Sequence, residues 1–364
     1  MTKICHMTSV HKRYDVRIFQ KECITLRKLG YEVHLVVSDA EPDEIVNDIY
    51  IHSTGYLPKN RFERMTGAAK EVYKLAKSLN AEIYHFHDPE LMGFGVKLSK
   101  QGKKVIFDSH EHTIVQIYSK RYLIFPKAVS KLFALYQKRV IRQIAEIITP
   151  TPQLVDLFKT INENAFLVTN YPKLEESMAG IKKKRQICFT GGCDSQWMLE
   201  NIAIAVSELD CEIIIAGSGN EEYINAIIKK GRGKVKYVGQ LGKEDVYRLQ
   251  SESLAGMAVN YGIQTIKEGG TLGNTKMFEY MMNGSPIICT DFPLWKMVVE
   301  KDDCGICVDA NSVEEIRKAI KYFLDCPDES IRMGENARAA VEREYNWDTQ
   351  VENLAQAYRT LITE

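Results

Sequence analysis

The sequence predicts an α/β protein with two doubly wound, Rossmann-like domains in tandem. Three observations favour this fold class. Short apolar runs rich in β-branched and aromatic residues alternate with longer stretches of helical period. The alternation restarts after residue 170, beyond a polar stretch at 171–185 that has no periodicity. The 364 residues also suffice for two domains, each with a sizeable core.

In the first half of the chain, helical patterns separate most of the apolar runs. The strands expected there are 3–8, 32–37, 48–52, 83–87, 104–108, 146–149 and 166–169. The helices expected there are 16–29, 61–79, 91–99 and 126–144. Strand-then-helix repetition implies a parallel sheet with helices on both faces.

The second half repeats this architecture. The strands expected are 186–190, 211–216, 234–238, 254–259, 286–290 and 305–308. The helices expected are 198–209, 221–230, 243–251, 276–282 and 313–324. We therefore expect an N-terminal domain over residues 1–170, a linker over 171–185 and a C-terminal domain over 186–346.

Charge and composition exclude one class of partner. The chain carries 48 basic and 48 acidic side chains, so binding to nucleic acid through overall charge is not expected. The two halves differ, however. Residues 1–170 carry seven more basic than acidic side chains and hold all eight histidines, whereas 17 of the 23 glycines lie beyond them. This asymmetry predicts two domains with different ligands.

The cysteines and the apolar runs indicate a cellular location. The nine cysteines are scattered, with Cys304 and Cys307 the one close pair, a pattern typical of reduced thiols. No run reaches the ~20 apolar residues of a membrane span. The first residues also lack the apolar core of a signal peptide. We expect a cytoplasmic protein.

Polar side chains gather in three loops that directly follow strands of the first half. Ligands of open α/β sheets bind outside the carboxyl ends of the strands, so these loops are expected to hold a substrate. The candidate residues are His11, Asp15, Arg17, His87, Asp88, His110 and Glu111. Among them, His110 can hold or protonate a sugar or phosphate oxygen, with a neighbouring carboxylate setting its tautomer.

Each of these loops also has a purely structural interpretation. Asp15 and Asp88 can cap the helices that follow them. His85 and His87 lie on one face of their strand, where a hydrogen-bonded cluster is favoured over a metal site. A packed polar cluster is likewise an alternative for the segment around His110. No metal is therefore expected.

The segment 97–142 is strongly basic. It carries eleven basic side chains against only Asp108 and Glu111, and apolar and aromatic residues are interleaved with them. Cationic charge beside exposed apolar groups is what binding to an anionic membrane surface needs. An amphipathic core helix with a solvated basic face explains the pattern equally well, and both interpretations stay open here.

The second half places glycine-rich loops between strands and helices. Gly191 and Gly192 follow one expected strand, and Gly217 and Gly219 follow the next. Glycines at such positions let backbone amides approach phosphate oxygens at a helix N-terminus. Loops around helices favour glycine in any case, so either pair alone is weak evidence.

A stronger pattern lies in the stretch 269–288, where a glycine-rich loop leads into a helix. Its candidate donor-binding residues are Thr271, Gly273, Asn274, Thr275, Lys276 and Glu279. Lys276 and Glu279 stand three residues apart on one helical face. The ammonium can bind a diphosphate, and the carboxylate can accept hydrogen bonds from both hydroxyls of a ribose. The alternative is a capped helix with a surface pair of charges.

Taken together, these segments resemble the retaining glycosyltransferases of family 4. The matching segments are 15–19, 87–91, 108–111, 170–172, 274–286 and 345–347. The resemblance implies a GT-B fold, in which two Rossmann-like domains face each other across a cleft. It implies a nucleotide-sugar donor held mainly by the C-terminal domain and an acceptor held mainly by the N-terminal one. It also implies a last helix, about 347–362, that packs back onto the first domain.

The resemblance assigns roles to two residues. Glu279 matches the family's ribose-binding glutamate, and His110 matches the histidine that contacts the transferred sugar. The sequence departs from the family at Thr271, where a glutamate near the donor sugar is usual. It also departs near Gly192 and Met198, roughly where an arginine and a lysine often clamp the diphosphate.

Lys276 and the amides of residues 273–275 are expected to replace that clamp. The function expected is transfer of a hexose or N-acetylhexosamine from a nucleotide diphosphate sugar, UDP favoured over GDP, to a glycan or lipid-linked glycan. Lys276 and helix N-termini would stabilise the leaving diphosphate, so no metal or other cofactor is expected. His110 and Lys276 are the expected catalytic residues.

The basic surface of 97–142 suggests an acceptor at the inner face of the cell membrane, in capsule or O-antigen assembly. Two alternatives remain at this point. One is a nucleotide-sugar epimerase of GT-B fold, which would act on the donor without an acceptor. The other is a binding-only relative that holds a nucleotide sugar without transferring it.

Overall fold

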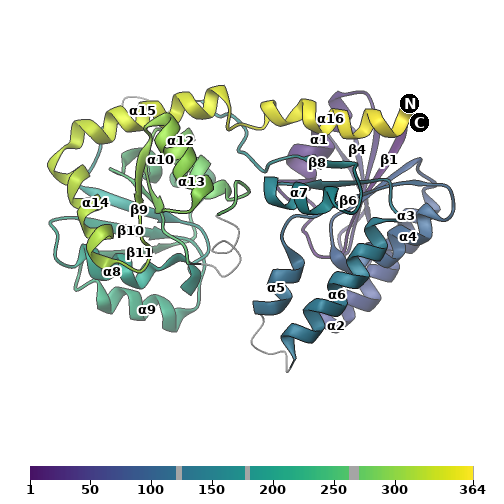
Figure 1. Cartoon of the computed structure of the whole chain (residues 1–364), viewed down its shortest axis with the longest axis horizontal. Coiled ribbons are helices and arrows are strands. Elements are labelled where there is room, and N and C mark those ends of the chain that lie inside the picture. The colour runs from purple at the N-terminus through teal and green to yellow at the C-terminus, as the bar shows by residue number, and fades with distance from the viewer. Residues whose placement is uncertain (120–124, 177–180, 262–269, 364) are drawn as a thin grey trace. The chain divides into compact units, whose positions relative to one another are not determined.

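The computed structural model describes residues 1–119, 125–176, 181–261 and 270–363 of the chain. These residues form two compact units (Figure 1). The first unit comprises Met1–Asn170 together with Asp348–Glu364, and the second comprises Tyr171–Trp347. The stretch expected as a linker, 171–185, is counted within the second unit, and its residues 177–180 lie outside the described residues.

The first unit is built on an eight-stranded sheet. Its strands are β1 (Lys3–Thr8), β2 (Glu32–Val37), β3 (Glu44–Val46), β4 (Ile49–Ser53), β5 (Ile83–Phe86), β6 (Lys104–Asp108), β7 (Glu146–Thr149) and β8 (Ala165–Leu167). Their order in the sheet is β3-β4-β2-β1-β5-β6-β7-β8. Neighbouring strands run parallel except β3 and β4. Because β1 pairs with both β2 and β5, the chain order reverses there, and the loops after β1 and β5 leave the same edge.

The helices of the first unit cover both faces of this sheet (Figure 1). They are α1 (Ile24–Lys28), α2 (Arg61–Glu63), α3 (Ala69–Ser78), α4 (Met92–Ser99), α5 (Thr113–Ser119), α6 (Pro126–Ile141), α7 (Pro152–Lys159) and α16 (Asp348–Thr363). Wider π-helical turns at Ile18–Cys23 and Arg64–Ala68 lead into α1 and α3, and a 3-10 turn at Pro89–Leu91 leads into α4. The helix α16, yellow in Figure 1, belongs to this unit although it comes last in the chain.

The described residues of the second unit form six parallel strands. They are β9 (Gln186–Thr190), β10 (Glu212–Ala216), β11 (Val235–Gly239), β12 (Gly256–Ala258), β13 (Ile287–Thr290) and β14 (Gly305–Val308), in the order β11-β10-β9-β12-β13-β14. Its helices are α8 (Leu199–Val206), α9 (Glu221–Lys230), α10 (Lys243–Glu252), α12 (Thr275–Met282), α13 (Pro293–Asp302), α14 (Val313–Asp325) and α15 (Pro327–Arg343), and a 3-10 turn at Ser195–Trp197 precedes α8.

Burial on both faces explains why the strands form continuous apolar runs in the sequence. Successive side chains of a strand point to opposite faces of its sheet, and helices cover both faces of a parallel sheet. In β9, Ile187 and Phe189 pack into one hydrophobic cluster, whereas Cys188 packs into another. All three side chains are fully buried. A strand of this kind has no polar face for the sequence to reveal.

The structure confirms the predicted fold class, an α/β chain of two parallel-sheet, Rossmann-like domains. Strand β3 and helices α5, α7, α13 and α15 were not predicted from the sequence. The strand predicted at 166–169 corresponds to β8, which begins one residue and ends two residues earlier. Among the described residues, no helix is both long and apolar enough to span a bilayer.

Candidate functional site

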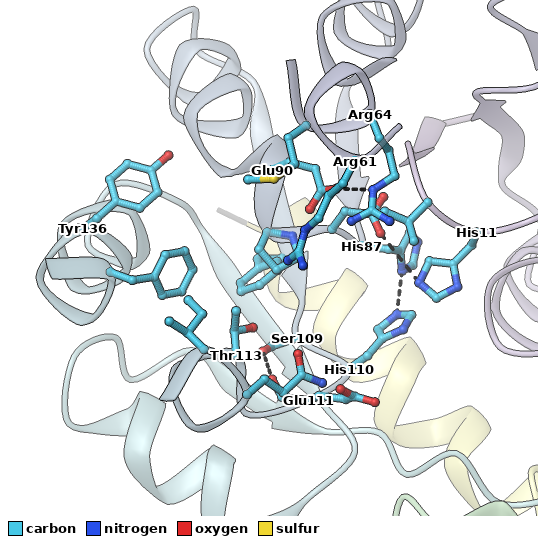
Figure 2. A pocket seen from close by; sticks show the side chains of 18 of the residues that line it. His11, Arg61, Arg64, His87, Glu90, Ser109, His110, Glu111, Thr113 and Tyr136 are labelled. Atoms are coloured by element: carbon cyan, nitrogen blue, oxygen red, sulfur yellow. Dashed lines mark hydrogen bonds and ion pairs between the residues drawn. The ribbon is translucent and has the colours of Figure 1, made fainter. Parts of the chain in front are cut away.

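A cavity of about 770 Å³ opens in the first unit at the carboxyl ends of β1, β5 and β6 (Figure 2). The loops after these strands form one side of it, and residues of α5 and α6 form another. Of the residues predicted to bind a substrate in this half, the cavity lining includes His11, His87, Asp88, His110 and Glu111. The structure therefore brings together side chains from three separate loops, at the sheet edge where open α/β folds bind ligands.

The polar end of this cavity is a group of histidines around one carboxylate. His110 Nε2 lies 3.0 Å from Asp108 Oδ2 and 3.2 Å from His87 Nδ1. Figure 2 shows His11, His87 and His110 gathered at one end of the cavity, with Tyr136 at the other. In a neutral His110 ring, the Nε2–H group donates to Asp108, so Nδ1 is the acceptor nitrogen. Such a ring can accept a hydrogen bond from a sugar hydroxyl.

A buried arginine stabilises the ionised form of Asp108. Arg17 Nε and Nη2 donate to the two carboxylate oxygens of Asp108 at 2.7 and 2.9 Å, and both side chains are buried. Burial opposes ionisation, but the Arg17 guanidinium and His110 hold the pKa of Asp108 well below its ordinary value. Burial also lowers the pKa of His87 to about 4, in spite of Asp108, so His87 is neutral near pH 7.

Two of the predicted substrate contacts stand behind the cavity instead of lining it. Arg17 is only 4% exposed and also donates to the carbonyl oxygen of Val168 at 3.0 Å. Its guanidinium therefore holds Asp108 in place, and Arg17 is not among the residues that line the cavity. Asp15 accepts hydrogen bonds from the backbone amides of Arg17 and Ile18 at 2.8 and 3.0 Å. This is the capping role that the sequence left open for Asp15.

The carboxylates of the loops after β1 and β5 also orient His11. Its Nδ1 lies 3.1 Å from Asp15 Oδ2, and its Nε2 lies 3.6 Å from Asp88 Oδ1. Burial by itself lowers the pKa of His11. These two carboxylates outweigh burial and raise that pKa above its ordinary value. The side chain of Asp88 does not cap the next helix. It accepts hydrogen bonds from Thr8 Oγ1 at 2.9 Å and from the Ser9 amide at 2.6 Å.

Much of the cavity lining was not identified from the sequence. Its apolar wall comes from α5, α6 and the turn after α2, with Met65, Ile117, Val129, Phe133 and Tyr136. Two arginines, Arg61 and Arg64, also line it, and Arg64 Nε pairs with Glu90 Oε1 at 3.2 Å. Helix α5 was not predicted, so its residues could not be assigned to the site. The cavity thus combines a polar end with an apolar wall.

In the second unit, two of the predicted glycines are required by close packing. Gly191 and Gly217 follow β9 and β10 with φ angles of 129° and 150°. A Cβ on Gly217 would collide with the Gly191 carbonyl group, and a Cβ on Gly191 would collide with Lys276 Nζ. Their amides donate to the carbonyl oxygens of Ala216 and Gly239 at 2.8 and 2.7 Å. These glycines therefore shape the loops, and their amides are already engaged.

The other two predicted glycines line a second cavity. Its volume is about 520 Å³, and Gly192 and Gly219 are part of its wall. The remaining wall residues are Cys193, Asp194, Ser195, Ser218, Asn220 and Tyr223. Asn220 caps α9 by accepting from the Tyr223 amide at 3.1 Å. The cavity therefore lies beside the N-terminus of a helix, where phosphate oxygens bind well.

Lys276 is buried beside this region. Only 8% of the residue is exposed, and its Nζ lies 3.8 Å and 3.9 Å from the ring centroids of Phe189 and Trp197. Burial lowers the pKa of Lys276 to about 7. The negative charge of Glu279 favours the ammonium and offsets part of this lowering. Glu279 is partly buried. The walls of the two cavities described here include neither residue, although Nζ lies next to Gly191.

The loop before α12 is described from Gly270 onward, so Gly269 lies outside the described residues. The Gly273 amide donates to Thr271 Oγ1 at 3.0 Å, and Trp295 Nε1 donates to the Thr271 carbonyl oxygen at 2.8 Å. Thr271 therefore fixes the shape of the loop. Asn274 is the N-cap residue of α12, and its buried Nδ2 has no hydrogen-bond partner among the described residues. Thr275 is the first residue of the helix.

Two family models match the chain. The model described as Glycosyltransferase Family 4 matches residues 20–165, and the model described as Glycosyl transferase-like matches residues 185–356. Each match falls largely on one of the two units, and together they span most of the chain. No curated protein matches the sequence.

Solved structures match nearly the whole chain at low sequence identity. A sucrose-phosphate synthase from Thermosynechococcus elongatus has a TM-score of 0.79 and 14% identity, with 100% of both chains covered. HepE from Anabaena, in complex with UDP-glucose, has a TM-score of 0.73 and 12% identity, covering 99% of this chain and 100% of its own. WaaG, a glycosyltransferase involved in lipopolysaccharide biosynthesis, has a TM-score of 0.69 and 13% identity, covering 98% and 99%. At these identities the likeness shows the fold alone.

Proposed function

The chain belongs to the family 4-like glycosyltransferases of GT-B fold, and from this premise we propose that it is a retaining, metal-independent hexosyltransferase. Its donor is a nucleotide diphosphate sugar, a UDP-sugar in preference to a GDP-sugar. It transfers a hexose or N-acetylhexosamine to a hydroxyl of a glycan or lipid-linked glycan. The preference for UDP is supported by the name of a structural neighbour, which was solved with UDP-glucose.

One observation carries the proposal: the buried ammonium of Lys276. An ammonium that has lost most of its hydration is costly unless an anion joins it. Here Nζ rests on two aromatic rings beside the glycine loop that follows β9. The first amides of α12, which begin at Thr275, have no partner within the helix. A diphosphate would satisfy both the ammonium and these amides, and Glu279 would accept from the ribose hydroxyls.

The proposed reaction breaks the bond between the sugar C1 and the β-phosphate oxygen. A bond from the acceptor oxygen to C1 forms on the same face, and a diphosphate oxygen takes the proton of the acceptor hydroxyl. Lys276 and the amides of α12 stabilise the negative charge that develops on the diphosphate, which fixed dipoles do well. His110 accepts a hydrogen bond from the transferred sugar, with Asp108 holding its tautomer.

The cavity of the first unit is the proposed acceptor site. His11 and Glu111 are among its hydrogen-bonding groups, and Phe133 and Tyr136 supply an apolar wall. Sugars have both hydroxyl groups and apolar ring faces. The hydrogen-bonding groups of the cavity would bind the hydroxyls, and the apolar wall would pack against the ring faces. Arg61 and Arg64 add positive charge, as an acceptor linked to a lipid phosphate requires.

Helix α6 supports an acceptor at a membrane surface. Its Leu132 and Leu135 are each 67% exposed, and Phe125 just before it is 72% exposed. Lys127 and Lys131 stand among them. Apolar side chains interleaved with lysines suit the headgroup region of an anionic bilayer. Residues 120–124, which the sequence assigns to the same surface, lie outside the described residues. We therefore propose that the protein acts in the cytoplasm, at the inner face of the cell membrane, in capsule or O-antigen assembly.

A thermal-shift panel of nucleotide sugars tests the donor. A ligand at 100 times its Kd stabilises the fold by about 2.7 kcal/mol, so a true donor raises Tm clearly. UDP-glucose and UDP-N-acetylglucosamine are expected to raise Tm more than GDP-mannose. The stabilising donor is then incubated with membrane glycolipids, and the anomeric configuration of the product is read by NMR.

Three results would contradict the proposal, each differently. A product of inverted configuration would rule out retention. Conversion of the donor in the absence of any acceptor would favour an epimerase. Donor binding with neither transfer nor hydrolysis would indicate a binding-only relative.

A further inference from the structure

The first unit contains a buried cluster that the proposed reaction leaves unexplained. It consists of His6 in β1, His85 in β5, His87 directly after β5, and Glu22 in the turn Ile18–Cys23. These side chains are 0–2% exposed. Each offers one ligand atom, and the four atoms lie within 4.8 Å of one another. The sequence places only His85 and His87 together, and the fold adds the other two.

Each imidazole of this cluster has one ring nitrogen held by another partner. His85 Nδ1 lies 2.7 Å and His6 Nε2 lies 3.3 Å from Tyr358 Oη of α16. His87 Nδ1 lies 3.2 Å from Asp108 Oδ2. Histidines that bind metals have this arrangement, because a hydrogen bond at one nitrogen fixes the lone pair of the other.

The remaining ring nitrogens face the interior of the cluster. His6 Nδ1 and His87 Nε2 lie 2.9 Å apart, and Glu22 Oε2 lies 4.0 Å from His87 Nε2. Among the described residues, His85 Nε2 has no hydrogen-bond partner, and neither carboxyl oxygen of Glu22 has one of good distance and angle, although Arg17 and Asp108 are its charged neighbours. Buried polar atoms without partners are rare in folded proteins, and a ligand often explains them.

The charges of the cluster also favour a cation. Arg17 Nε lies 3.0 Å from Glu22 Oε1, but the same N–H group points to Asp108 at 2.7 Å. One guanidinium thus faces two buried carboxylates, and the three histidines are neutral donors. The ionised form of a buried carboxyl group without hydrogen bonds is unfavourable, and a bound cation would remove that cost.

We propose that His6, Glu22, His85 and His87 bind one divalent transition-metal ion, with zinc the best match. Three imidazoles and one carboxylate are a donor set that zinc accepts in tetrahedral geometry, at about 2.0–2.2 Å from each ligand. Tetrahedral ligands at these distances stand about 3.3–3.4 Å apart, so His6 Nδ1 and His87 Nε2 would separate slightly from 2.9 Å and Glu22 Oε2 would approach His87 Nε2 from 4.0 Å. All four ligands come from the protein, so the ion holds structure and takes no part in the transfer.

The site joins elements that are distant in the sequence. It ties β1, β5 and the turn before α1 together, and Tyr358 extends it to α16. It also fixes the ring of His87, which lies beside His110 in the cavity. The competing explanation is a metal-free cluster in which His6 and His87 share a proton and Glu22 is protonated beside Asp108.

Metal analysis of the full chain, purified without a histidine tag, separates the two explanations. Mass spectrometry after gel filtration is expected to find about one zinc ion per chain. Growth with cobalt in place of zinc is expected to yield a coloured protein with visible absorption bands. Glu22→Gln and His6→Gln should each lower the metal content at least tenfold. His34→Gln is the matched control, because His34 is a buried histidine of β2 that pairs with His52 outside the cluster.

A wild-type chain with no more zinc than the buffer blank, and no cobalt bands, would overturn the proposal. So would an equal loss of metal in the His34→Gln control. If the cluster variants fail to fold, the zinc content and the cobalt spectrum of the wild-type chain still decide the question. Neither result depends on donor binding, which the nucleotide-sugar panel tests separately.

Discussion

The two candidate regions of this chain handle buried charge in opposite ways. In the first unit, the Arg17 guanidinium is paired with Asp108 at 2.7 and 2.9 Å, and Asp108 in turn lies beside His110. In the second unit, the Lys276 ammonium rests on the rings of Phe189 and Trp197, and burial lowers its pKa to about 7. One charge is compensated within the protein, whereas the other is suited to an anionic ligand.

This difference indicates what each region contributes. A paired charge stabilises the fold and holds its neighbours in place before any substrate arrives. A buried charge with no anionic partner costs stability until a ligand compensates it, although the aromatic rings beneath it offset part of that cost. Substitutions should therefore separate the two regions: those in the first unit lose folding stability, and those in the second lose donor binding and turnover.

The largest effect is expected for Arg17→Met. Removing one partner of a buried ion pair leaves the other charge uncompensated, which typically costs about 3–5 kcal/mol. Here Asp108 and Glu22 both lose their arginine. Urea unfolding followed by circular dichroism should show that loss. Arg27→Met is the control, because Arg27 pairs with the exposed Asp48 at the surface, and it should change stability by about 0.5 kcal/mol or less. Equal losses in both variants would show that the network adds no stability.

Lys276→Ala should leave the fold intact and remove activity. Loss of one charge-stabilising group at a developing anion typically costs 10²- to 10³-fold in kcat, or about 2.7–4 kcal/mol. Folding stability should change little, because removal of the costly buried charge offsets the packing that the side chain loses. Steady-state kinetics and a urea titration measure the two quantities. A variant that unfolds more easily yet turns over normally would show that Lys276 is only a packing residue.

Some helices and strands could be predicted from the sequence because they leave a clear pattern in it, whereas others leave none. Buried parallel strands such as β6 and β9 have continuous apolar runs, and their predicted bounds are the observed ones. Helices α7, α13 and α15 were missed although each begins with proline at its first position, a known start signal. Strand β3 has only three residues at the sheet edge and closes on β4 through Asn47 and Asp48 with positive φ angles. So short an element leaves no periodicity.

The candidate site shows the same limit. His11, His87 and His110 stand out in the sequence because they follow strands, and the cavity brings them together. The sequence could not show that Arg17 turns inward to Asp108. Arginine and aspartate occur both in loops that contact a substrate and in buried ion pairs, so the residue types do not distinguish the two. Nor could it join His6 and Glu22 to His85, since that depends on the pairing of β1 with β5.

Glu279→Ala is expected to have a smaller effect than the loss of Lys276. Its carboxylate is proposed to accept from the ribose hydroxyls, and hydrogen bonds to charged groups contribute about 1.5–3 kcal/mol. The donor KM should rise about 10- to 100-fold, with the acceptor KM unchanged. Glu300→Ala serves as control because Glu300 is an exposed residue of α13. A donor KM equal to the wild-type value would refute the ribose assignment.

The pH dependence of donor binding tests the ammonium most directly, and near pH 7 its effect is the smallest of these. Burial lowers the pKa of Lys276 to about 7, so the free protein loses this charge as the pH rises through 7. The charged form is the one that binds a diphosphate. The donor Kd should therefore be constant below about pH 6 and rise by up to tenfold for each pH unit above 7.

Calorimetric titration of the donor between pH 6 and pH 9 measures this dependence, and Lys276→Arg is the matched variant. Arginine stays charged throughout this range, so the rise in Kd should disappear even if the longer side chain weakens binding overall. The diphosphate of a nucleotide sugar does not titrate between pH 6 and pH 9, so the donor itself adds no slope. If the arginine variant kept the full pH dependence, another group would be responsible, and the contrast between the two buried charges would not hold.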